Sequence, residues 1–208
     1  LSGVKGGRFA QACVPAQVFS IVLSDILGDP LDMIASGPAV PDTSTCGQAI
    51  AIAEKYHLRL STAAQELLRQ ETPKALTNVT TRITGSVRQL CTAASETCQT
   101  LGYTPVVLTA SLACEAREAG AFLGAVAQYH QDSARSLAFI AGGETVVHLT
   151  GTGKGGRNQE IALAGAKLLD GLAGTALFSL GSDGTDGPTD AAGGIVTGET
   201  AGTLREAG

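Results

Sequence analysis

The sequence predicts an α/β protein of two domains, in which parallel or mixed sheets are flanked by helices. Three observations support this prediction. The 208 residues are 44% hydrophobic but only 4% aromatic, so a core built from Ala, Val, Leu and Ile is expected. Short apolar runs alternate with amphipathic segments, as in sheets covered by Ala-rich helices. A polar stretch, ETPKALTNVTT, breaks this alternation and predicts a domain boundary between residues 78 and 79.

The first domain is expected to contain one strand, one long loop and two helices. The apolar run FSIVLSD predicts a buried strand at 19–25. The Gly- and Pro-rich segment that follows predicts an ordered loop with a helical turn at 31–34. Helical periodicity, with an N-cap among Thr43 to Thr45, predicts a helix in TCGQAIAIAEKYH, and a second helix is expected at 61–69.

The second domain shows the alternation that is typical of parallel α/β units. The strands at 137–144 and 145–151 follow each other directly, which predicts a β-hairpin. The full set of expected strands is 81–87, 104–110, 137–144, 145–151 and 175–183, and the expected helices are 88–102, 114–129 and 158–169.

Charge and composition argue against several classes of partner. The net charge of −5, without a Lys/Arg run, argues against nucleic-acid binding. No apolar run has transmembrane length and the three histidines are isolated, so neither a membrane protein nor a zinc site is expected. Five cysteines without C-x-x-C spacing favour reduced thiols and a cytoplasmic protein. Because the chain opens without Met and stops within a helical pattern, it is expected to be incomplete at both ends.

Three Gly- and Asp-rich loops each follow an apolar strand. In parallel α/β sheets, ligands bind where such loops gather at the carboxyl ends of the strands. These loops are therefore the expected site, although glycine-rich loops elsewhere are usually only turns. Their sequences are SDILGDPLDMIASGP, GTGKGGRNQE and GSDGTDGPTD.

GTGKGGRNQE permits two interpretations that involve a nucleotide. Gly151, Gly153 and Gly156 fit the G-x-G-x-x-G spacing of a dinucleotide-binding loop. However, a hairpin rather than a parallel βα unit is expected before it, and Asp170 and Glu160 fall at the wrong distances for the ribose contact, so an NAD(P)H site is disfavoured. The segment is not a Walker A loop either, because Lys154 precedes the last two glycines instead of following them.

The same stretch fits a phosphate site better. Its glycines let the backbone approach a ligand closely, and the helix that starts near Asn158 adds the positive end of its dipole. Arg157 supplies a planar fork for two phosphate oxygens, and Glu160, three residues later, can pair with it. The structural alternative is a tight glycine turn with a surface arginine.

The other two loops offer carboxylates and neutral donors. Asp183 and Asp186, at short spacing, suit Mg²⁺ or hydrogen bonds to substrate hydroxyls. Asp25 carries the same ambiguity, and Asp and Gly are also ordinary turn residues. In IASGP, the Ser36 hydroxyl and the Gly37 amide suit the positioning of a substrate or a phosphate.

Taken together, SDILGDPLDMIASGPAVPD, AGGETVVHLTGTGKGGRNQE and GSDGTDGPTDAAGGIVT resemble the signature stretches of the type-2 glycerate kinases, in order and in approximate spacing. This family contains the MOFRL module and has often been labelled as hydroxypyruvate reductase. The resemblance implies that 1–78 form the carboxyl-terminal part of a larger Rossmann-like domain. It implies that 79–208 form a MOFRL-type domain, truncated at its carboxyl terminus. It also implies a cleft between the domains in which Mg-ATP phosphorylates D-glycerate to 2-phosphoglycerate.

The resemblance and the loops together assign roles to individual residues. An Arg in the family's GGRNQE motif is thought essential, and it maps onto Arg157. A homodimer is one expected assembly, and the alternative functions are an NAD(P)H-dependent hydroxypyruvate reductase and an inactive fragment that only binds a ligand. The expected catalytic residues are Arg157 and Lys5; ATP is expected at Ser36, Gly37, Gly153, Gly155, Gly156 and Asn158, D-glycerate at Asp25, Glu144, Glu160 and Thr185, and Mg²⁺ at Asp183 and Asp186.

Overall fold

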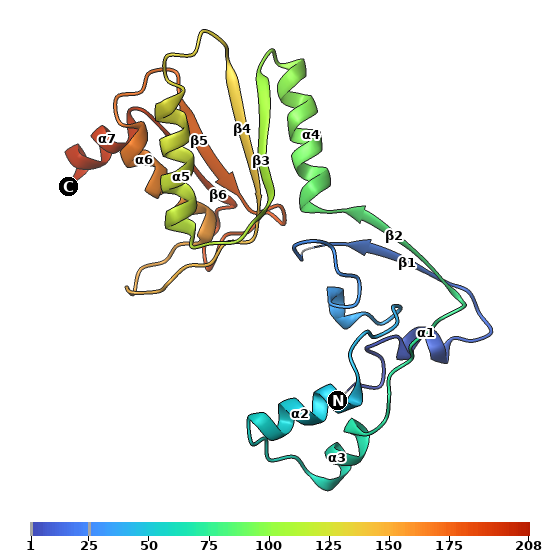
Figure 1. The fold of residues 1–208 in the computed structure, drawn as a ribbon. Helices are drawn as coiled ribbons and strands as arrows, with labels where there is room; N and C mark the ends of the chain where they lie inside the picture. The colour runs from blue at the N-terminus through green and yellow to red at the C-terminus, as the bar shows by residue number, and fades with distance from the viewer. Residues whose placement is uncertain (1, 25) are drawn as a thin grey trace. The chain divides into compact units, whose positions relative to one another are not determined.

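The computed structural model describes residues 2–24 and 26–208, which fold into two compact units divided between Gln89 and Leu90. Figure 1 traces the alternation of helices and strands along the chain, and the prediction of an α/β fold with parallel or mixed sheets is confirmed. How the two units correspond to the domains expected over 1–78 and 79–208 stays a prediction. The helices are α1 (Arg8–Ala12), η1 (Ile34–Ser36, a 3-10 turn), α2 (Cys46–Lys55), α3 (Thr62–Leu68), α4 (Val87–Thr100), α5 (Ala116–Tyr129), α6 (Arg157–Leu169) and α7 (Thr200–Ala207). The strands are β1 (Val18–Leu23), β2 (Val79–Gly85), β3 (Thr104–Leu112), β4 (Leu137–Gly143), β5 (Ala176–Leu180) and β6 (Gly193–Thr197).

In the amino-terminal unit, β1 and β2 form a parallel pair, with Val18 opposite Val79. The strand expected at 19–25 is present, but the expectation that it is buried is wrong. Phe19, Ile21 and Leu23 are each at least 75% exposed. A continuous apolar run is typical of strands that are covered on both faces, whereas β1 has one neighbouring strand here and one of its faces is bare.

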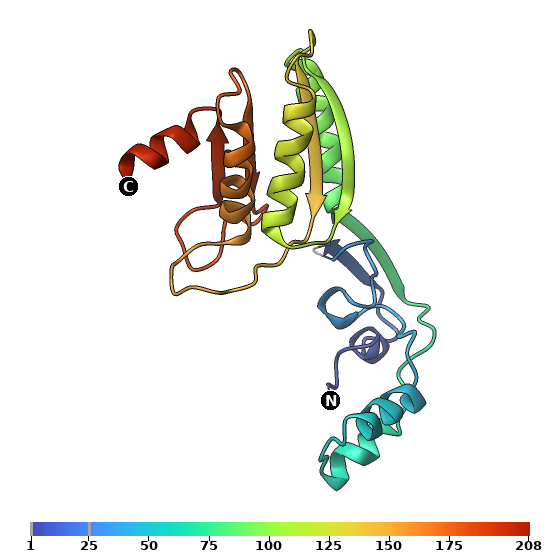
Figure 2. The ribbon, with the colours of Figure 1, turned by 60° about the vertical axis from the view of Figure 1, so that its left-hand side comes forward.

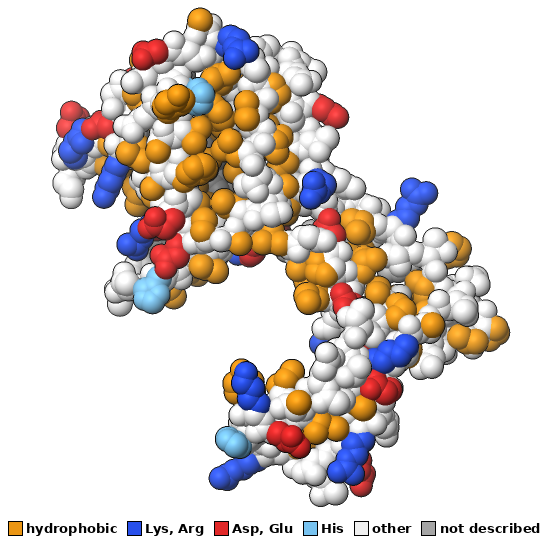
Figure 3. Space-filling model, in the orientation of Figure 1, with side chains coloured by type: hydrophobic (Ala, Val, Ile, Leu, Met, Phe, Trp, Pro, Cys, Tyr) orange, Lys and Arg blue, Asp and Glu red, His pale blue; other side chains and the backbone are white. Residues whose placement is uncertain are grey.

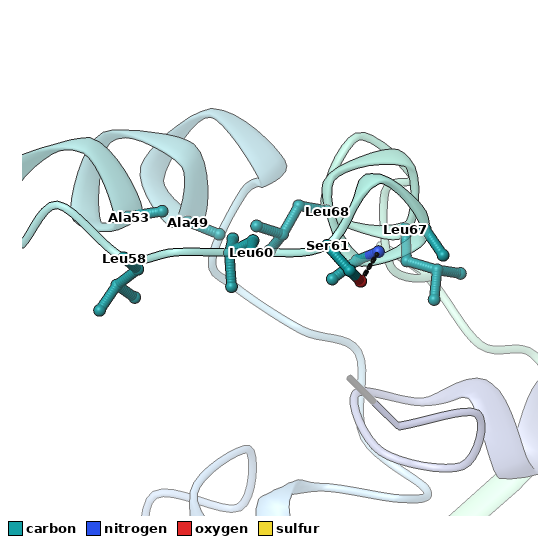
Figure 4. Close-up of a pocket in the computed structure, with 9 residues that line it drawn as sticks. Ala49, Ala53, Leu58, Leu60, Ser61, Leu67 and Leu68 are labelled. Carbon is teal, nitrogen blue, oxygen red and sulfur yellow. Dashed lines mark hydrogen bonds between the residues drawn. The ribbon is translucent and has the colours of Figure 1, made fainter.

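The two expected helices of this unit are confirmed together with their caps. Thr45 and Gln48 form a capping box: the Gln48 amide donates to Thr45 Oγ1 (3.2 Å), and the Thr45 amide donates to Gln48 Oε1 (2.8 Å). The Ser61 hydroxyl accepts from the Ala64 amide and caps α3. Between α2 and α3 lies an apolar groove of about 450 Å³, lined mainly by alanine and leucine side chains (Figure 4).

In the carboxyl-terminal unit, α5 packs closely against α6, and α6 packs on the antiparallel β5–β6 pair (Figures 1 and 2). Glycine makes the helix contact possible, because a Cβ at Gly120 would overlap the Ile161 carbonyl. Exposed hydrophobic side chains on α5 include Phe122 and Tyr129, and Figure 3 shows hydrophobic side chains gathered over the face on which α5 lies. The buried core of the unit consists of Ala116, Ala119, Ile161, Ala162, Ala166, Leu169, Leu177 and Val196.

The hairpin expected from 137–151 is wrong. β4 pairs with β3 in parallel, and the chain then continues alongside β3 instead of turning back. The Glu144 amide donates to the Leu112 carbonyl (2.8 Å), and Val146 forms an isolated parallel bridge with Glu115. The expected strand at 145–151 is therefore one bridge followed by a loop, and this loop delivers the chain to the start of α6.

Two observed elements were not predicted. β6 begins with Gly193 and Gly194, which are poor strand formers. Glycine is required at 193, since a Cβ there would overlap the Ser179 carbonyl of β5. The five residues of α1 are too few to show a helical period. Over the part of the chain that the structure describes, none of the helices combines the length and the apolar character needed to cross a membrane.

Candidate active site

Two of the glycine-rich loops, 151–156 and 181–192, meet at the start of α6 through the side chain of Asp186. Gly156 is the N-cap residue of α6, has an extended backbone (φ −149°, ψ 175°) and has no side chain with which to cap the helix. The cap comes instead from Asp186 in the other loop. Asp186 Oδ1 accepts from the Asn158 amide (2.9 Å), and Oδ2 accepts from the Gln159 amide (2.8 Å).

The side chains of the same two helical residues complete the contact. Asn158 Nδ2 donates to Asp186 Oδ1, and Gln159 Nε2 donates to Asp186 Oδ2. Both donor–acceptor distances are 3.1 Å. The carboxylate therefore receives four hydrogen bonds while the residue is only 3% exposed. Burial alone raises the pKa of Asp186, but the hydrogen bonds from Asn158 and Gln159 outweigh it, so the pKa lies below its ordinary value.

Further polar contacts extend this arrangement to β5 and to the rest of the loop. The Ser179 hydroxyl at the end of β5 donates to Asn158 Oδ1 (2.6 Å). Gln159 Nε2 also donates to Thr189 Oγ1 (3.0 Å), and the Thr189 hydroxyl donates to the Asp186 carbonyl (2.7 Å). The end of β5, the start of α6 and the loop after β5 are thus held in one hydrogen-bonded network.

The glycines of these loops fall into two groups. Gly156 and Gly187 are packed: a Cβ at Gly156 would overlap the Asp186 carboxylate, and one at Gly187 (φ 61°) would overlap the Gly155 carbonyl. By contrast, a Cβ at Gly151, Gly153 or Gly155 would meet no atom within 4 Å. The first group lets the two loops touch each other, and the second borders open space.

Arg157, the first residue of α6, turns its guanidinium toward the segment after β4. Arg157 Nη1 forms an ion pair with Glu144 and donates to the Thr145 carbonyl (3.2 Å). The expectation that Glu160 pairs with Arg157 is wrong, because Glu160 Oε1 lies 3.9 Å from Arg117 Nε on α5. Arg157 and Glu144 are both about half exposed. Their ion pair therefore orients the Arg157 guanidinium but contributes little to the stability of the fold.

Asp183 places a second carboxylate near Arg157. Its Oδ1 accepts from the Thr185 amide (3.0 Å). This hydrogen bond is the largest cause of a lowered pKa for Asp183, and the Thr185 side chain and the positive charge of Arg157 also lower that pKa. Asp183 is therefore ionised at neutral pH and is exposed to solvent.

The amino-terminal unit brings Lys5 and Ser36 together. The Gly6 amide donates to the Ser36 carbonyl (3.0 Å), and the Gly7 amide donates to the Gly37 carbonyl (2.8 Å). The helical turn expected at 31–34 is displaced to η1, and Ser36 and Gly37 have left-handed backbones (φ 60° and 56°). Asp25 lies outside the described residues. A cavity of about 710 Å³ is lined by Ser2, Lys5, Gly6, Arg8, Asp32, Ser36, Asp42 and Thr72.

The structure thus places the expected site residues in two sets. Glu144, Arg157 and Asp183 are near one another in the carboxyl-terminal unit, and Lys5 and Ser36 line one cavity in the amino-terminal unit. Sequence reasoning missed Ser179, Gln159 and Thr189 in the network around Asp186, and the Thr145 carbonyl that accepts from Arg157. The contact between Asn158 and Asp186 joins residues 28 positions apart, and no short-range spacing in the sequence predicts it.

Within residues 2–24 and 26–208, no group of three or more His, Cys, Asp or Glu side chains is arranged to hold a metal ion.

Known proteins resemble the chain over its whole length. Residues 1–69 match the profile of a domain of unknown function (DUF4147), and residues 137–208 match the MOFRL family. A Thermotoga maritima protein named D-glycerate 2-kinase is 51% identical over 212 residues, which are 100% of this chain and 51% of the relative. An Agrobacterium vitis protein with the provisional name hydroxypyruvate reductase is 35% identical to this chain. The match covers 100% of this chain and 50% of the relative.

A solved structure gives the same picture in three dimensions. The crystal structure of glycerate kinase (EC 2.7.1.31) from Thermotoga maritima matches with a TM-score of 0.94 at 50% identity, and covers 100% of this chain and 51% of that chain. The chain therefore spans about half the length of the relatives that it matches.

Proposed function

We propose that this chain, which belongs to the type-2 glycerate kinase family, is part of an enzyme that transfers a phosphoryl group from ATP to D-glycerate and forms 2-phosphoglycerate. One observation carries the proposal: an arginine held in a fixed direction at the start of α6 lies near an ionised, exposed aspartate. Phosphoryl transfer needs little covalent chemistry from the protein and depends on positioning and on stabilisation of charge. This arrangement supplies both.

Arg157 is the proposed catalytic residue. A guanidinium remains charged at all physiological pH values, and its planar fork matches two oxygens of a phosphoryl group. Glu144 and the Thr145 carbonyl both contact Nη1, so the rest of the guanidinium can face a ligand while these contacts hold the side chain in place. Glu144 is therefore proposed both to orient Arg157 and to lie beside D-glycerate, together with Thr185.

The residues present fit a magnesium ion that is held mainly by the nucleotide. Mg²⁺ usually takes one or two protein carboxylates and keeps several waters. Asp183 offers one ionised, exposed carboxylate close to Arg157 and is the proposed ligand. When bound, ATP would supply the phosphoryl group and Mg²⁺ would neutralise part of its negative charge.

Each unit offers a further anion contact of its own: the glycine-rich loop in the carboxyl-terminal unit and a cavity in the amino-terminal unit. Gly153 and Gly155 border open space and can bring backbone N–H groups to a phosphate. Lys5, Arg8 and Ser36 line one cavity, and these groups are proposed to contact an anion. Glu160 is a weaker proposal for the substrate site, since it faces Arg117 on α5.

The name of the Agrobacterium vitis relative favours a second candidate, an NAD(P)H-dependent hydroxypyruvate reductase. The geometry argues against it. In a dinucleotide loop the pyrophosphate lies on the helix N-terminus, whereas here the Asn158 and Gln159 amides donate to Asp186. The last glycine of the pattern, Gly156, packs on that same carboxylate. A pyrophosphate at this position would have to displace a buried carboxylate that already has four partners.

The test is phosphorus NMR of the whole protein with Mg-ATP and D-glycerate. Formation of 2-phosphoglycerate supports the kinase, and its absence together with NADH oxidation by hydroxypyruvate supports the reductase. The 208-residue chain is assayed alongside the whole protein. A signal from the whole protein and none from the chain would indicate that the chain alone is inactive.

A further inference from the structure

We propose that Asp186 is a positioning residue: its buried carboxylate holds the start of α6 so that Arg157 faces the transferring phosphoryl group, and it does not bind the metal ion. The inference rests on the proposed function for the identity of the reaction. The hydrogen-bonded contact itself does not depend on that function. It also separates two aspartates, Asp183 and Asp186, which look equivalent in the sequence GSDGTDG.

The carboxylate of Asp186 is saturated with hydrogen-bond donors. A carboxylate has about four lone-pair positions, and Asp186 already accepts four N–H donors over 2.8–3.1 Å. Its residue is 3% exposed, so neither a lone pair nor a solvent path is left for Mg²⁺. Asp183 differs on both counts, since it is exposed and its carboxylate accepts from the Thr185 amide through one oxygen, Oδ1.

The contact with Asp186 holds the backbone on both sides of Arg157. Asp186 holds the backbone amides of Asn158 and Gln159, the two residues that follow Arg157. Gly156, which precedes Arg157, has no side chain with which to cap the helix and packs directly on the same carboxylate. The backbone on both sides of Arg157 is thus held by one side chain, and the negative charge also complements the positive end of α6.

Asp186 occupies helix donors that would otherwise be available to a phosphate. The start of a helix can bind an anion through its free N–H groups, but here an internal carboxylate takes two of them. The phosphoryl group is then recognised by the Arg157 side chain, while the helix terminus serves to orient that side chain.

The inference is tested in the whole protein with Asp186→Asn, Asp183→Asn and Asp190→Asn. Asp190 belongs to the same loop, is exposed and serves as the matched control. In Asp186→Asn, one carboxylate oxygen becomes an NH₂ group that faces other N–H donors, so part of the contact is lost. The measurements are kcat, the KM for ATP, the Mg²⁺ concentration that gives half the maximal rate, Mn²⁺ affinity, and hydrogen exchange of the peptide that contains 157–160.

Asp186→Asn is expected to lower kcat by about 10²-fold, the effect typical of a misplaced catalytic group. Its KM for ATP, Mg²⁺ requirement and Mn²⁺ affinity are expected to stay unchanged, and the start of α6 is expected to exchange faster. Asp183→Asn is expected to raise the Mg²⁺ requirement without changing exchange, and Asp190→Asn to change neither. A raised Mg²⁺ requirement in Asp186→Asn, or wild-type kcat and exchange, would overturn the inference.

A milder variant covers the case in which Asp186→Asn does not fold. Gln159→Leu removes one side-chain donor to Asp186 and keeps both backbone donors. A smaller loss of kcat at constant Mg²⁺ requirement is expected. Faster exchange with wild-type kcat would show that the contact does not position Arg157.

If the wild-type protein makes no 2-phosphoglycerate, the proposed function fails. Exchange and Mn²⁺ affinity then still decide whether Asp186 holds α6 or a metal ion.

Discussion

One added methyl group, in Gly156→Ala, tests whether the contact between the two glycine-rich loops is as tight as the structure indicates. The backbone at Gly156 is extended (φ −149°), so alanine is conformationally allowed there. The new Cβ, however, would lie closer than 3.0 Å to the carboxyl carbon and both carboxyl oxygens of Asp186, a separation that real Cβ atoms essentially never show. The carboxylate must therefore move away from the Asn158 and Gln159 amides.

The expected magnitude follows from the interactions that this movement weakens. Loss of a helix N-cap costs about 1 kcal/mol, and hydrogen bonds to a charged group contribute about 1.5–3 kcal/mol. Alanine in place of glycine restores about 0.4–1 kcal/mol by restricting the unfolded chain. We expect a net destabilisation of about 1–3 kcal/mol, which lowers Tm.

Gly155→Ala is the matched control in this experiment. Gly155 is the preceding residue, its φ is not positive, and a Cβ there would meet no atom within 4 Å. The substitution should leave Tm unchanged or raise it slightly, because only the effect on the unfolded chain remains. Calorimetry of the whole protein compares both variants with the wild type. Equal Tm values for Gly155→Ala and Gly156→Ala would refute the reasoning.

Three further predictions concern Arg157, Asp186 and the α5–α6 contact. Arg157→Ala should lower kcat by about 10²–10³-fold, as loss of a charge-stabilising group does, with Tm nearly unchanged since both side chains of the Glu144 pair are about half exposed; unchanged steady-state turnover would remove Arg157 from the mechanism. The pKa of Asp186 lies below its ordinary value of 3.8, so its ionised form stabilises the fold above pH 3.8 and this contribution is lost as the pH falls through the lowered pKa. The difference in unfolding free energy between wild type and Asp186→Asn should therefore shrink in acid, and a gap of equal size at pH 2 and pH 7 contradicts the assignment. Gly120→Ala should destabilise the protein by about 1–3 kcal/mol, because its Cβ would overlap the Ile161 carbonyl; a denaturation midpoint equal to that of the wild type would show that the helices can separate freely.

Most of the secondary structure could be predicted from local patterns. The helices α2, α4, α5 and α6 follow from periodicity and caps, and an N-cap of α2 was expected among Thr43 to Thr45 from the residue types. The errors occur where a distant partner decides the outcome. The segment after β4 was expected to turn back as a hairpin, but its hydrogen bonds go to the chain that leaves β3. β6 was missed because Gly193 has no strand propensity of its own and is required only by Ser179 on the facing strand.

The sequence by itself determined the fold class, the family resemblance and the three loops that collect the polar residues, because those depend on composition and on short-range order. It could not rank Asp183 against Asp186, or name the partners of Arg157 and Glu160. Only the tertiary structure decided these points, because a free carboxylate and a saturated one differ in the hydrogen-bond donors that the folded chain places around them. For Asp186, those groups are amides that lie 27 and 28 residues away along the chain.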